Sequence, residues 1–508
     1  MTVDDPDRHG LTVTAFPAAQ LLPDLRRVLA RLFLPGEGVS EANSRAADLV
    51  ERVRSLSAAE AARAATRILE RFADREDDLV SLLRSHAAAV GHDHDAPDAM
   101  EEDRILILGA ALTAEYALEG AALCNPSVVP HPDQTGLLPG QLRVALALRA
   151  IGEGHISSIG FVSATIGPGS RWAFDERVLP VSTPTVSEGD WTKKHFKETL
   201  QGTERLNQLS HAVIRALPAR FRAAEIEDAI RGLPIDLVQQ PGTRLELDNI
   251  RAVAATTYHA RFAETSLLSQ RVLFPNAAEE ANGMEDARFV LFTDDDGTVE
   301  YRATYTGYDG RSIEPRLIVS SDLEYFRIHR LSGNAAKNKG MALFPRRVGG
   351  DMLAVTRIDG ERMSLSRSKD GFVWTVDTVL SAPRRLWEAV QTGNCGSPIE
   401  TDRGWLVLTH GVGPMRRYCI GAMLLDLDHP AIVLASLTEP LIEPLGDHQD
   451  GYVPNVVYTC GAVVHEGTLW IPYGIGDIRI GVSSVVLEDL LDAMTPTMAA
   501  LQVAGAPR

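Results

Sequence analysis

The chain of 508 residues has few cysteines and no long hydrophobic run. Its four cysteines, Cys124, Cys395, Cys419 and Cys460, lie far apart and form no CxxC pair, which excludes the usual structural zinc motifs and a disulfide framework. We therefore expect four reduced, buried thiols. The apolar stretch 105–112 is far shorter than the ~20 residues that a transmembrane helix needs, so we expect no membrane association.

Basic residues are scarce relative to acidic ones. The 50 Lys and Arg residues face 68 Asp and Glu residues, for a formal net charge of -18, which disfavours a nucleic-acid partner unless the basic side chains gather in one place. The first residues, MTVDDPDRHG, lack the basic and apolar regions of a secretory signal, which predicts a cytoplasmic protein. Walker, GxSxG and HExxH sequences and a GxGxxG after a strand are absent, so the common nucleotide, hydrolase and zinc-enzyme motifs give no support.

The first hundred residues have the composition of amphipathic helices. Segments 18–34, 40–56 and 58–90 are rich in Ala, Leu, Arg and Glu, with apolar residues three and four positions apart. This spacing predicts three helical segments. Ser57 and Glu60 form the capping box that would open the third of them.

A polar stretch over residues 92–102 separates this region from the rest of the chain. It contains side chains that could act as metal ligands, namely His92, Asp93, His94 and Asp95. Because no matching ligand pair is near in the sequence, a solvated linker is the preferred interpretation. We therefore predict an N-terminal helical region over residues 1–100 and a second domain over residues 101–500.

From about residue 122 onward, short β-branched and aromatic runs alternate with turns rich in Gly, Pro, Asn and Asp. Their spacing of roughly 8 to 15 residues favours an antiparallel all-β array over alternating strands and helices. Examples of the expected strand cores are 144–149, 155–163, 287–292, 300–308, 352–357, 405–410, 420–426, 462–464 and 469–473.

Two turns and one interruption are expected within this array. Residues 294–297, Asp-Asp-Asp-Gly, resemble a calcium loop only loosely, since no Glu stands at the twelfth position, and a hairpin turn is the better interpretation. Residues 348–351, Val-Gly-Gly-Asp, predict a second turn. Residues 193–231 return to helical periodicity, with two segments that each end at a proline, which predicts a helical insertion over about residues 190–235.

Polar clusters at the strand ends carry the candidate chemistry. In one of them, Glu285 and Asp286 precede Arg288 and an apolar strand. Because consecutive residues of an extended chain face opposite ways, only one of the two carboxylates is expected to face a given pocket, with Arg288 on the side of Asp286. A purely structural Asp–Arg ion pair is the alternative.

Further clusters occupy residues 337–340, 394–398, 405–411, 416–418 and 473–477. Polar residues at the ends of consecutive hairpins, most of them near a glycine, would gather around one central pocket in a toroidal β architecture. Together Arg149, Lys339, Arg357 and His410 would form a local anion site in this acidic chain.

In this order the clusters resemble the inverting mannoside phosphorylases and related β-mannosidases of glycoside hydrolase family 130. The resemblance spans residues 125–482 and rests on six ordered motifs: Asn125-Pro126-Ser127 with Arg149; Met284-Glu285-Asp286-Ala287-Arg288; Lys339 with Leu343-Phe344-Pro345; Thr356-Arg357; Gly404-Trp405 to His410-Gly411; and Asn455-Val456-Val457 with Tyr473-Gly474 to Asp477. The chain departs from the family pattern at four positions, with Ala287 for Pro, Asn338 and Gly340 for acidic residues, and Thr356 for His.

The resemblance implies an all-β five-bladed β-propeller, to which the N-terminal α-helical region and the helical insertion are added. It implies that Asp286 is the general acid, whose proton reaches the glycosidic oxygen through the 3-hydroxyl of the bound mannose. The implied phosphate ligands are Lys339, Arg357, His410 and Tyr418. The implied substrate ligands are Asn125, Ser127, Arg149, Arg288 and Asp477, with Arg288 also orienting Asp286.

The implied reaction is phosphorolysis of a β-mannoside oligosaccharide to α-mannose 1-phosphate and a shortened acceptor, or the reverse synthesis. A phosphorylase needs an acid and a basic cradle but no base, because inorganic phosphate, the co-substrate, is already negatively charged. The alternatives are a phosphate-independent β-mannoside hydrolase and a non-catalytic sugar-binding propeller. We expect no metal or organic cofactor, no nucleic-acid or membrane partner, and homo-oligomer contacts through the helical regions.

Overall fold

The computed structural model describes residues 11–35, 39–89, 100–168, 171–203 and 205–498. The chain divides into two compact units: unit 1 contains Met1–Pro23, Ala121–Glu176 and Thr183–Arg508, and unit 2 contains Asp24–Gly120 and Arg177–Ser182. The four residues His92 to Asp95, interpreted above as a linker or as metal ligands, lie outside the described residues. No helix in the described ranges is both long and apolar enough to cross a membrane.

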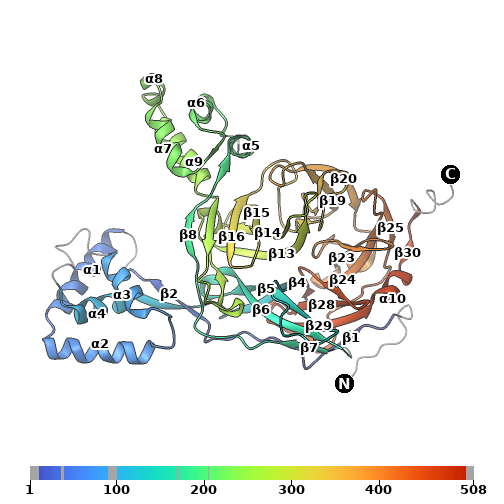
Figure 1. Cartoon of the computed structure of the whole chain (residues 1–508), viewed down its shortest axis with the longest axis horizontal. Helices are drawn as coiled ribbons and strands as arrows, with labels where there is room; N and C mark the ends of the chain where they lie inside the picture. Colours follow the sequence, from blue (N-terminus) through green and yellow to red (C-terminus); the bar gives the residue numbers. More distant parts are fainter. Residues whose placement is uncertain (1–10, 36–38, 90–99, 169–170, 204, 499–508) are drawn as a thin grey trace. The chain divides into compact units, whose positions relative to one another are not determined.

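Unit 2 combines helices with a two-stranded sheet (Figure 1). Its elements are β2 (Val28–Leu32), α1 (Val39–Arg54), α2 (Ala58–Phe72), α3 (Leu79–Ala88), α4 (Glu102–Ala111) and β3 (Thr113–Ala117). The capping box is confirmed, since Ser57 Oγ accepts a hydrogen bond from the Glu60 N–H at 3.3 Å. The predicted helix 58–90 is instead two helices, because Asp78 caps a new one by accepting from the Ser81 N–H at 3.0 Å.

The predicted helix over residues 18–34 is wrong. Pro23 interrupts the segment, and a proline inside a helix removes a hydrogen bond and clashes with the preceding turn. Residues Val28–Leu32 instead pair with Thr113–Ala117 as antiparallel strands. Arg27, which is buried, forms an ion pair of 2.9 Å with Glu119, and this long-range contact stabilises the extended conformation.

Helices α3 and α4 approach each other so closely that residue 109 must be glycine. A Cβ atom added to Gly109 would overlap the main-chain carbonyl of Leu83, which cannot move aside as a side chain can. We therefore expect Gly109→Ala to lower the free energy of unfolding by about 1–3 kcal/mol, the usual cost of overpacking, as measured by thermal or denaturant unfolding. Gly202→Ala is the matched control, because a Cβ atom there would meet no atom within 4 Å. Equal losses in the two variants would contradict this account.

Unit 1 contains the larger β-sheets. The largest has eleven strands in the order β4 (Ala122–Pro130), β5 (Leu142–Ile151), β6 (Ser157–Gly167), β13 (Gly283–Thr293), β14 (Val299–Tyr308), β15 (Ile313–Ser320), β16 (Tyr325–Arg330), β11 (Tyr258–Arg261) and β8 (Thr185–Glu188), with β7 (Arg171–Phe174) and β12 (Val272–Leu273) also paired to β6. Strands β6 and β13 meet in parallel at a single pair, Ser157 and Gly283, and the other pairs of this sheet are antiparallel.

Three smaller sheets follow along the chain (Figure 1). The first contains β17 (Ala342–Leu343), β18 (Met352–Thr356), β19 (Met363–Ser368) and β20 (Thr375–Ser381). The second contains β21 (Gln391–Asn394), β22 (Ile399–Thr401), β23 (Gly404–Val412), β24 (Tyr418–Leu425), β25 (Val433–Ser436) and β30 (Thr495–Pro496). The third contains β26 (Val457–Tyr458), β27 (Val463–His465), β28 (Thr468–Ile475), β29 (Arg479–Val486) and β1 (Thr14–Ala15). Each of the nine predicted strand cores overlaps a strand, which confirms the prediction that this part of the chain is largely β.

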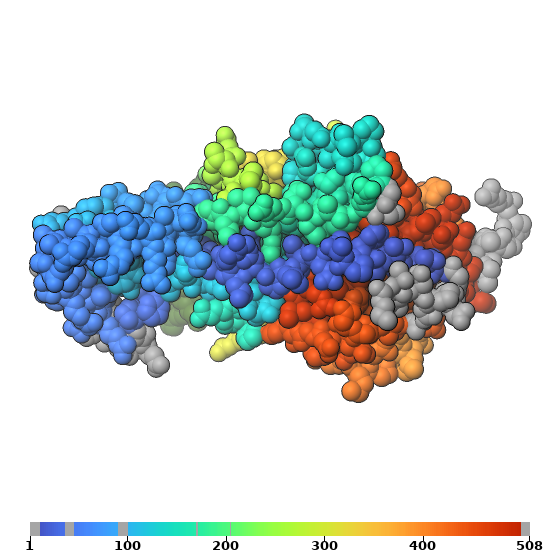
Figure 2. All heavy atoms as spheres, turned by 90° about the horizontal axis from the view of Figure 1, so that it is seen from below, coloured from blue at the N-terminus to red at the C-terminus, as the bar shows by residue number. Residues whose placement is uncertain are grey.

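The N-terminal segment of unit 1 lies along the last sheet. Thr14 and Ala15 pair with β29, and Leu21 forms an isolated bridge with Ile480. Figure 2 shows this segment in dark blue beside the red C-terminal strands. The N-terminal segment is thus held in the same sheet as β28 and β29, while β30 pairs with β25 in the preceding sheet.

The predicted helical insertion is present and longer than expected. It contains β9 (Trp191–Thr192), α5 (Lys193–Gly202), α6 (Gln208–Ala216), β10 (Arg220–Phe221), α7 (Ala223–Arg231), α8 (Ile235–Val238) and α9 (Thr243–Ala254). The helices follow β8, the edge strand of the largest sheet. They extend beyond residue 235 because α9 contributes Leu247, Ile250 and Val253 to the insertion's own hydrophobic core.

Both predicted turns are confirmed. Residues 294–297 connect β13 to β14, with the Gly297 N–H donating to the Asp294 carbonyl at 2.9 Å. The Asp294 carboxylate pairs with Arg347 at 2.6 Å, which agrees with a structural turn. In the second turn, the Val348 N–H donates to the Asp351 carbonyl at 2.9 Å.

Candidate active site

Two strand bulges build the centre of the candidate site. The β4–β5 and β13–β14 pairings each shift register, and the bulges contain Asn125 and Asp286. Their φ angles are 50° and 56°, in the left-handed region that Asn and Asp tolerate better than most residues. A bulge re-aims the side chain that it carries. Here Asn125 Nδ2 donates to Asp286 Oδ1 at 2.6 Å, so the two bulges meet.

Arg149 contacts both carboxylates of the Glu285-Asp286 pair. Its Nη2 lies 2.6 Å from Glu285 Oε1, and its Nη1 lies 3.2 Å from Asp286 Oδ1. The expectation that only one of these carboxylates faces a given pocket is therefore wrong, because the alternation of a regular strand fails inside the bulge. Lys339 Nζ forms an ion pair with the other oxygen of Glu285, Oε2. The carboxylate of Glu285 is thus held on both sides by cations.

The buried carboxyl group of Asp286 is ionised in the ligand-free protein. The positive charges of Arg149, Arg288 and Lys339 act on it from three different strands or loops. Burial alone would raise the pKa of Asp286, but these charges outweigh burial and lower it to about 2. The hydrogen bond from Asn125 also favours the charged form.

Arg288 is buried, and its guanidinium donates hydrogen bonds to three other groups of the protein. Its Nη1 donates to the main-chain carbonyl of Asp286 at 2.7 Å, its Nε to the carbonyl of Cys395 at 2.8 Å, and its Nη2 to the hydroxyl of Tyr458 at 3.0 Å. The contact with Asp286 is thus to the main chain, where it holds the left-handed residue in place. This arrangement supports the orienting role of Arg288 implied by the family resemblance.

A second group of side chains continues from Tyr458. Arg357 Nη1 lies 3.0 Å from His410 Nε2, and His410 Nδ1 lies 3.1 Å from the carbonyl oxygen of Asn394. Because a guanidinium can only donate, Nε2 accepts and the ring proton stands on Nδ1. Burial lowers the pKa of His410 well below its usual value, and the charge of Arg357 lowers it further. His410 is therefore neutral near pH 7, and Arg357 supplies the positive charge.

Aromatic rings join the two groups. The ring of Tyr458 packs edge-on against His410 at a centroid distance of 5.0 Å, and Tyr418 stacks on His410 at 6.2 Å. The hydroxyl of Tyr458 accepts a hydrogen bond from Arg288 and so connects the rings around His410 to Arg288. Tyr458 was not predicted as a site residue, although it directly follows the Asn455-Val456-Val457 motif, which was the available signal.

Asp477 adds a further acidic group, in the turn between β28 and β29. Its φ of 54° places it in the left-handed region, as for Asn125 and Asp286. Burial raises the pKa of Asp477 to about 6, while the charge of Arg149 partly opposes that rise. Its electrostatic coupling to Arg149 and Asp286 places Asp477 in the same charged region.

Ser127 is placed differently from the other predicted substrate ligands. It is fully buried, and its Oγ accepts a hydrogen bond from the Phe289 N–H at 2.8 Å. The hydroxyl therefore connects β4 to β13. The structure gives Ser127 a role in packing the two strands together.

Several buried polar atoms of the site have no hydrogen-bond partner among the described residues. They are Asn125 Oδ1, Asp477 Oδ1, Arg357 Nε, and both Nδ2 and Oδ1 of Asn394. Each unpaired buried group costs about 1–3 kcal/mol, a cost that is understandable where a ligand supplies the missing partners. Asn394 was not predicted as a ligand, and its only signal was the polar cluster 394–398.

The charged groups suit an organic substrate and an anion. Over the part of the chain that the structure describes, no group of three or more His, Cys, Asp or Glu side chains is arranged to hold a metal ion. The site offers instead a buried carboxyl group, the three cations that act on it, and a mixture of unpaired donors and acceptors. Such a set can bind hydroxyl groups and a small anion side by side.

Comparison with known proteins identifies the family. A family profile described as β-1,4-mannooligosaccharide phosphorylase matches residues 261–496. A 1,2-β-oligomannan phosphorylase from Thermoanaerobacter sp. (strain X514) is 31% identical over 227 residues, which are 44% of this chain and 75% of that protein. A β-1,2-mannobiose phosphorylase from the same organism is 33% identical over 221 residues, which are 43% of this chain and 71% of that protein. The chain belongs to glycoside hydrolase family 130.

A solved structure is also similar. The β-1,2-mannobiose phosphorylase from Listeria innocua, in complex with β-1,2-mannobiose, aligns with a TM-score of 0.45 and 20% sequence identity, over 75% of this chain and 93% of that one.

Proposed function

We propose that this protein is an inverting β-mannoside phosphorylase. The observation that carries the proposal is that buried Asp286 shares one site with two cations, Lys339 and Arg357, while Asn125 and Asp477 offer unpaired acceptors for sugar hydroxyls. An acid beside an anion cradle is what phosphorolysis requires. The names of the two Thermoanaerobacter relatives agree with this reaction.

The proposed step forms one bond and breaks one. A phosphate oxygen attacks the anomeric carbon of the mannose from the face opposite the glycosidic oxygen, and the carbon–oxygen bond to the acceptor breaks. Asp286 supplies the proton for the leaving oxygen, relayed by the 3-hydroxyl of the mannose. The products are α-mannose 1-phosphate and an acceptor shortened by one residue.

Phosphate binding would also prepare the acid. Without phosphate, the basic neighbours keep Asp286 ionised, whereas a general acid must carry a proton. A phosphate dianion that pairs with Lys339 and Arg357 offsets their charge, and its own negative charge raises the pKa of a nearby carboxyl group. Phosphate binding would thus favour the protonated form of Asp286, which the proposed reaction needs.

The carboxylates of the site favour phosphorolysis over hydrolysis. An inverting hydrolase needs a second, available carboxylate to activate water. Glu285 precedes Asp286 in the chain, and both of its oxygens are engaged by Arg149 and Lys339. Asp477 is the other carboxyl group of the site, and the proposal assigns it to the sugar hydroxyls. A carboxylate with both oxygens held by cations has no free oxygen with which to accept a proton from water.

The proposal also covers the fold, the cellular location and the cofactor requirement. Five consecutive antiparallel groups, β4–β7, β13–β16, β17–β20, β21–β25 and β26–β29, are the number that a five-bladed propeller needs. We propose that these groups are its blades, that the enzyme acts in the cytoplasm, and that phosphate and mannoside react without a metal or an organic cofactor.

The proposal is tested by following products from β-1,2-, β-1,3- and β-1,4-mannobiose with and without phosphate. We expect mannose 1-phosphate from at least one linkage, in amounts that depend on phosphate, and the reverse synthesis from mannose 1-phosphate and mannose. Release of free mannose at the same rate without phosphate would support a hydrolase. No turnover of any linkage in either direction would support a sugar-binding module.

Asn394 gives a prediction in which stability and activity change in opposite directions. Its unpaired amide costs stability in the ligand-free protein and gains partners when substrate binds. We expect Asn394→Ala to lower kcat/KM by about 5- to 150-fold, the equivalent of 1–3 kcal/mol, while the melting temperature stays equal or rises. Gln391→Ala, at the half-buried start of the same strand, is the matched control and should leave kcat/KM unchanged. A variant that loses stability and keeps its activity would show that the amide has a purely structural role.

A further inference from the structure

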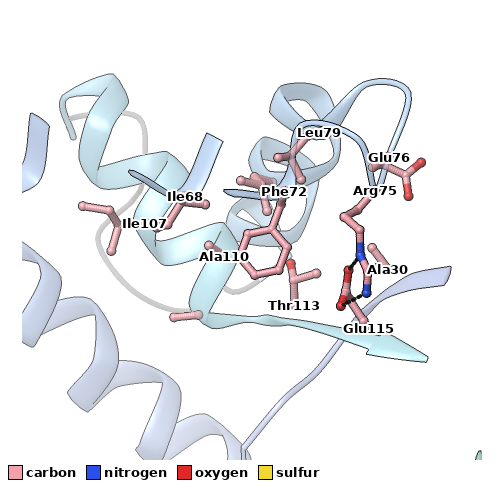
Figure 3. A pocket seen from close by; sticks show the side chains of 12 residues that line it. Ala30, Ile68, Phe72, Arg75, Glu76, Leu79, Ile107, Ala110, Thr113 and Glu115 are labelled. Carbon is pink, nitrogen blue, oxygen red and sulfur yellow. Dashed lines mark hydrogen bonds and ion pairs between the residues drawn. The ribbon is translucent and has the colours of Figure 1, made fainter. Parts of the chain in front are cut away.

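Unit 2 contains an apolar pocket that the proposed reaction does not use. It has a volume of about 350 Å³ and lies among α2, α3, α4 and the β2–β3 sheet. Figure 3 shows Phe72 at its centre, with Ile68, Leu79, Ile107 and Ala110 around it. Exposed apolar concavities of this kind mark sites of interaction.

The rim of the pocket favours a positively charged group. Arg75 forms a two-pronged ion pair with Glu115, with distances of 2.7 and 2.9 Å, so its charge is already compensated. Glu76 is half-buried beside Asp77 and Asp78, and it forms no ion pair with a described residue. Burial raises the pKa of Glu76 to about 7, and the two neighbouring carboxylates add to the rise. A cation placed there would relieve this unfavourable cluster of acidic groups.

The same unit exposes a segment with the matching chemistry. Leu32, Phe33 and Leu34 are 42%, 51% and 45% exposed, a contiguous apolar run at the end of β2. Side chains two positions apart share one face of an extended strand. Arg31 therefore lies on the same face as Phe33, where its guanidinium packs over the ring of Tyr116 at 5.5 Å.

Strand geometry directs this pair away from the chain's own pocket. Ala30 lines the pocket from β2, so the odd-numbered residues Arg31 and Phe33 face the opposite way. The strand continues through Phe33, whose N–H donates to the Leu112 carbonyl at 2.8 Å. Phe33 therefore cannot fill the pocket of its own unit without breaking that pairing.

We propose that Phe33 of one chain inserts into this pocket on a second copy of the chain, with Arg31 beside Glu76. A rigid aromatic side chain in an apolar pocket, flanked by a charge pair, is the usual composition of an interface hot spot. The contact joins two different surfaces of the same unit. It therefore builds a head-to-tail assembly, which closes into a ring when the rotation permits.

The test measures the mass of the full chain by sedimentation velocity over a range of micromolar concentrations. We expect the wild type to associate, and Phe33→Ser to raise the dissociation constant by about 30-fold or more, as expected for a hot spot of at least 2 kcal/mol. Leu25→Ser is the matched control, because Leu25 is 67% exposed in the same unit and lies outside the apolar run. The control should associate as the wild type does.

The pocket side is tested with two variants. Ala110→Trp fills the pocket, and Glu76→Lys reverses the charge at its half-exposed rim without altering the packing; each should prevent association. In an equimolar mixture of Phe33→Ser and Ala110→Trp, the first supplies an intact pocket and the second an intact Phe33, so the mixture should form a heterodimer. A monomeric wild type, association unchanged by both Phe33→Ser and Glu76→Lys, or a mixture that stays monomeric would each overturn the proposal.

Discussion

Replacing Asp286 with Asn is expected to lower kcat for phosphorolysis by about 10²- to 10⁴-fold, the usual contribution of a general acid. The amide keeps the shape of the side chain and can still accept the hydrogen bond from Asn125, but it has no acidic proton to give. The KM values for mannoside and phosphate should change little, because the binding groups remain. The measurement is steady-state kinetics with mannose 1-phosphate as the product followed.

The pH profile separates this role from a structural one. In the wild type, kcat should fall as the pH rises through the pKa of Asp286 in the phosphate complex, because the acid must be protonated. The residual activity of Asp286→Asn should lack that descending limb. Asp295→Asn is the matched control, since Asp295 lies exposed in the β13–β14 turn. A variant that retains wild-type kcat and pH profile would remove Asp286 from the mechanism.

Replacing Arg357 with Ala is expected to raise the KM for phosphate far more than the KM for mannoside. Removing one partner of a buried charged pair costs about 2–5 kcal/mol, which corresponds to an increase of roughly 30-fold or more. Arg357 offers a buried, unpaired Nε, and its Nη1 fixes the tautomer of His410. Both features suit a phosphate ligand.

Arg362→Ala provides the matched control for this experiment. Arg362 is half-exposed and pairs with Asp359 at 2.6 Å, in the turn between β18 and β19. Its loss should leave both KM values unchanged. Equal increases in the KM for phosphate and for mannoside in Arg357→Ala would contradict the assignment of Arg357 to phosphate.

Local sequence patterns predicted nine strand cores correctly, but one predicted helix was wrong. The runs 144–149 and 405–410 are largely apolar and include the β-branched residues Val144, Val407 and Thr409, and both lie in strands. Segment 18–34 has helical periodicity, yet Val28–Leu32 forms a strand because its partner, Thr113–Ala117, is more than eighty residues away. Pairing between such distant segments cannot be recognised from the local sequence. Pro23, however, did argue against a continuous helix over this segment.

The site was predicted at the level of motifs and not of geometry. The Glu285-Asp286 motif pointed to the proposed acid, but strand alternation predicted that the two carboxylates would face apart. The bulge at Asp286 overturns that rule, and sequence alone signals it only through residues that tolerate a positive φ. Tyr458 and Asn394 escaped prediction because their roles depend on contacts between strand groups that are distant in the sequence.

The anomeric configuration of the first product tests the central claim most directly. The enzyme is mixed with the active β-mannobiose and phosphate inside an NMR tube, and the anomeric proton and phosphorus signals are followed before the product can equilibrate. The account predicts α-mannose 1-phosphate, formed in equal amount with the shortened acceptor and absent when phosphate is omitted. A β-configured phosphate ester, or free mannose formed without phosphate, would contradict it.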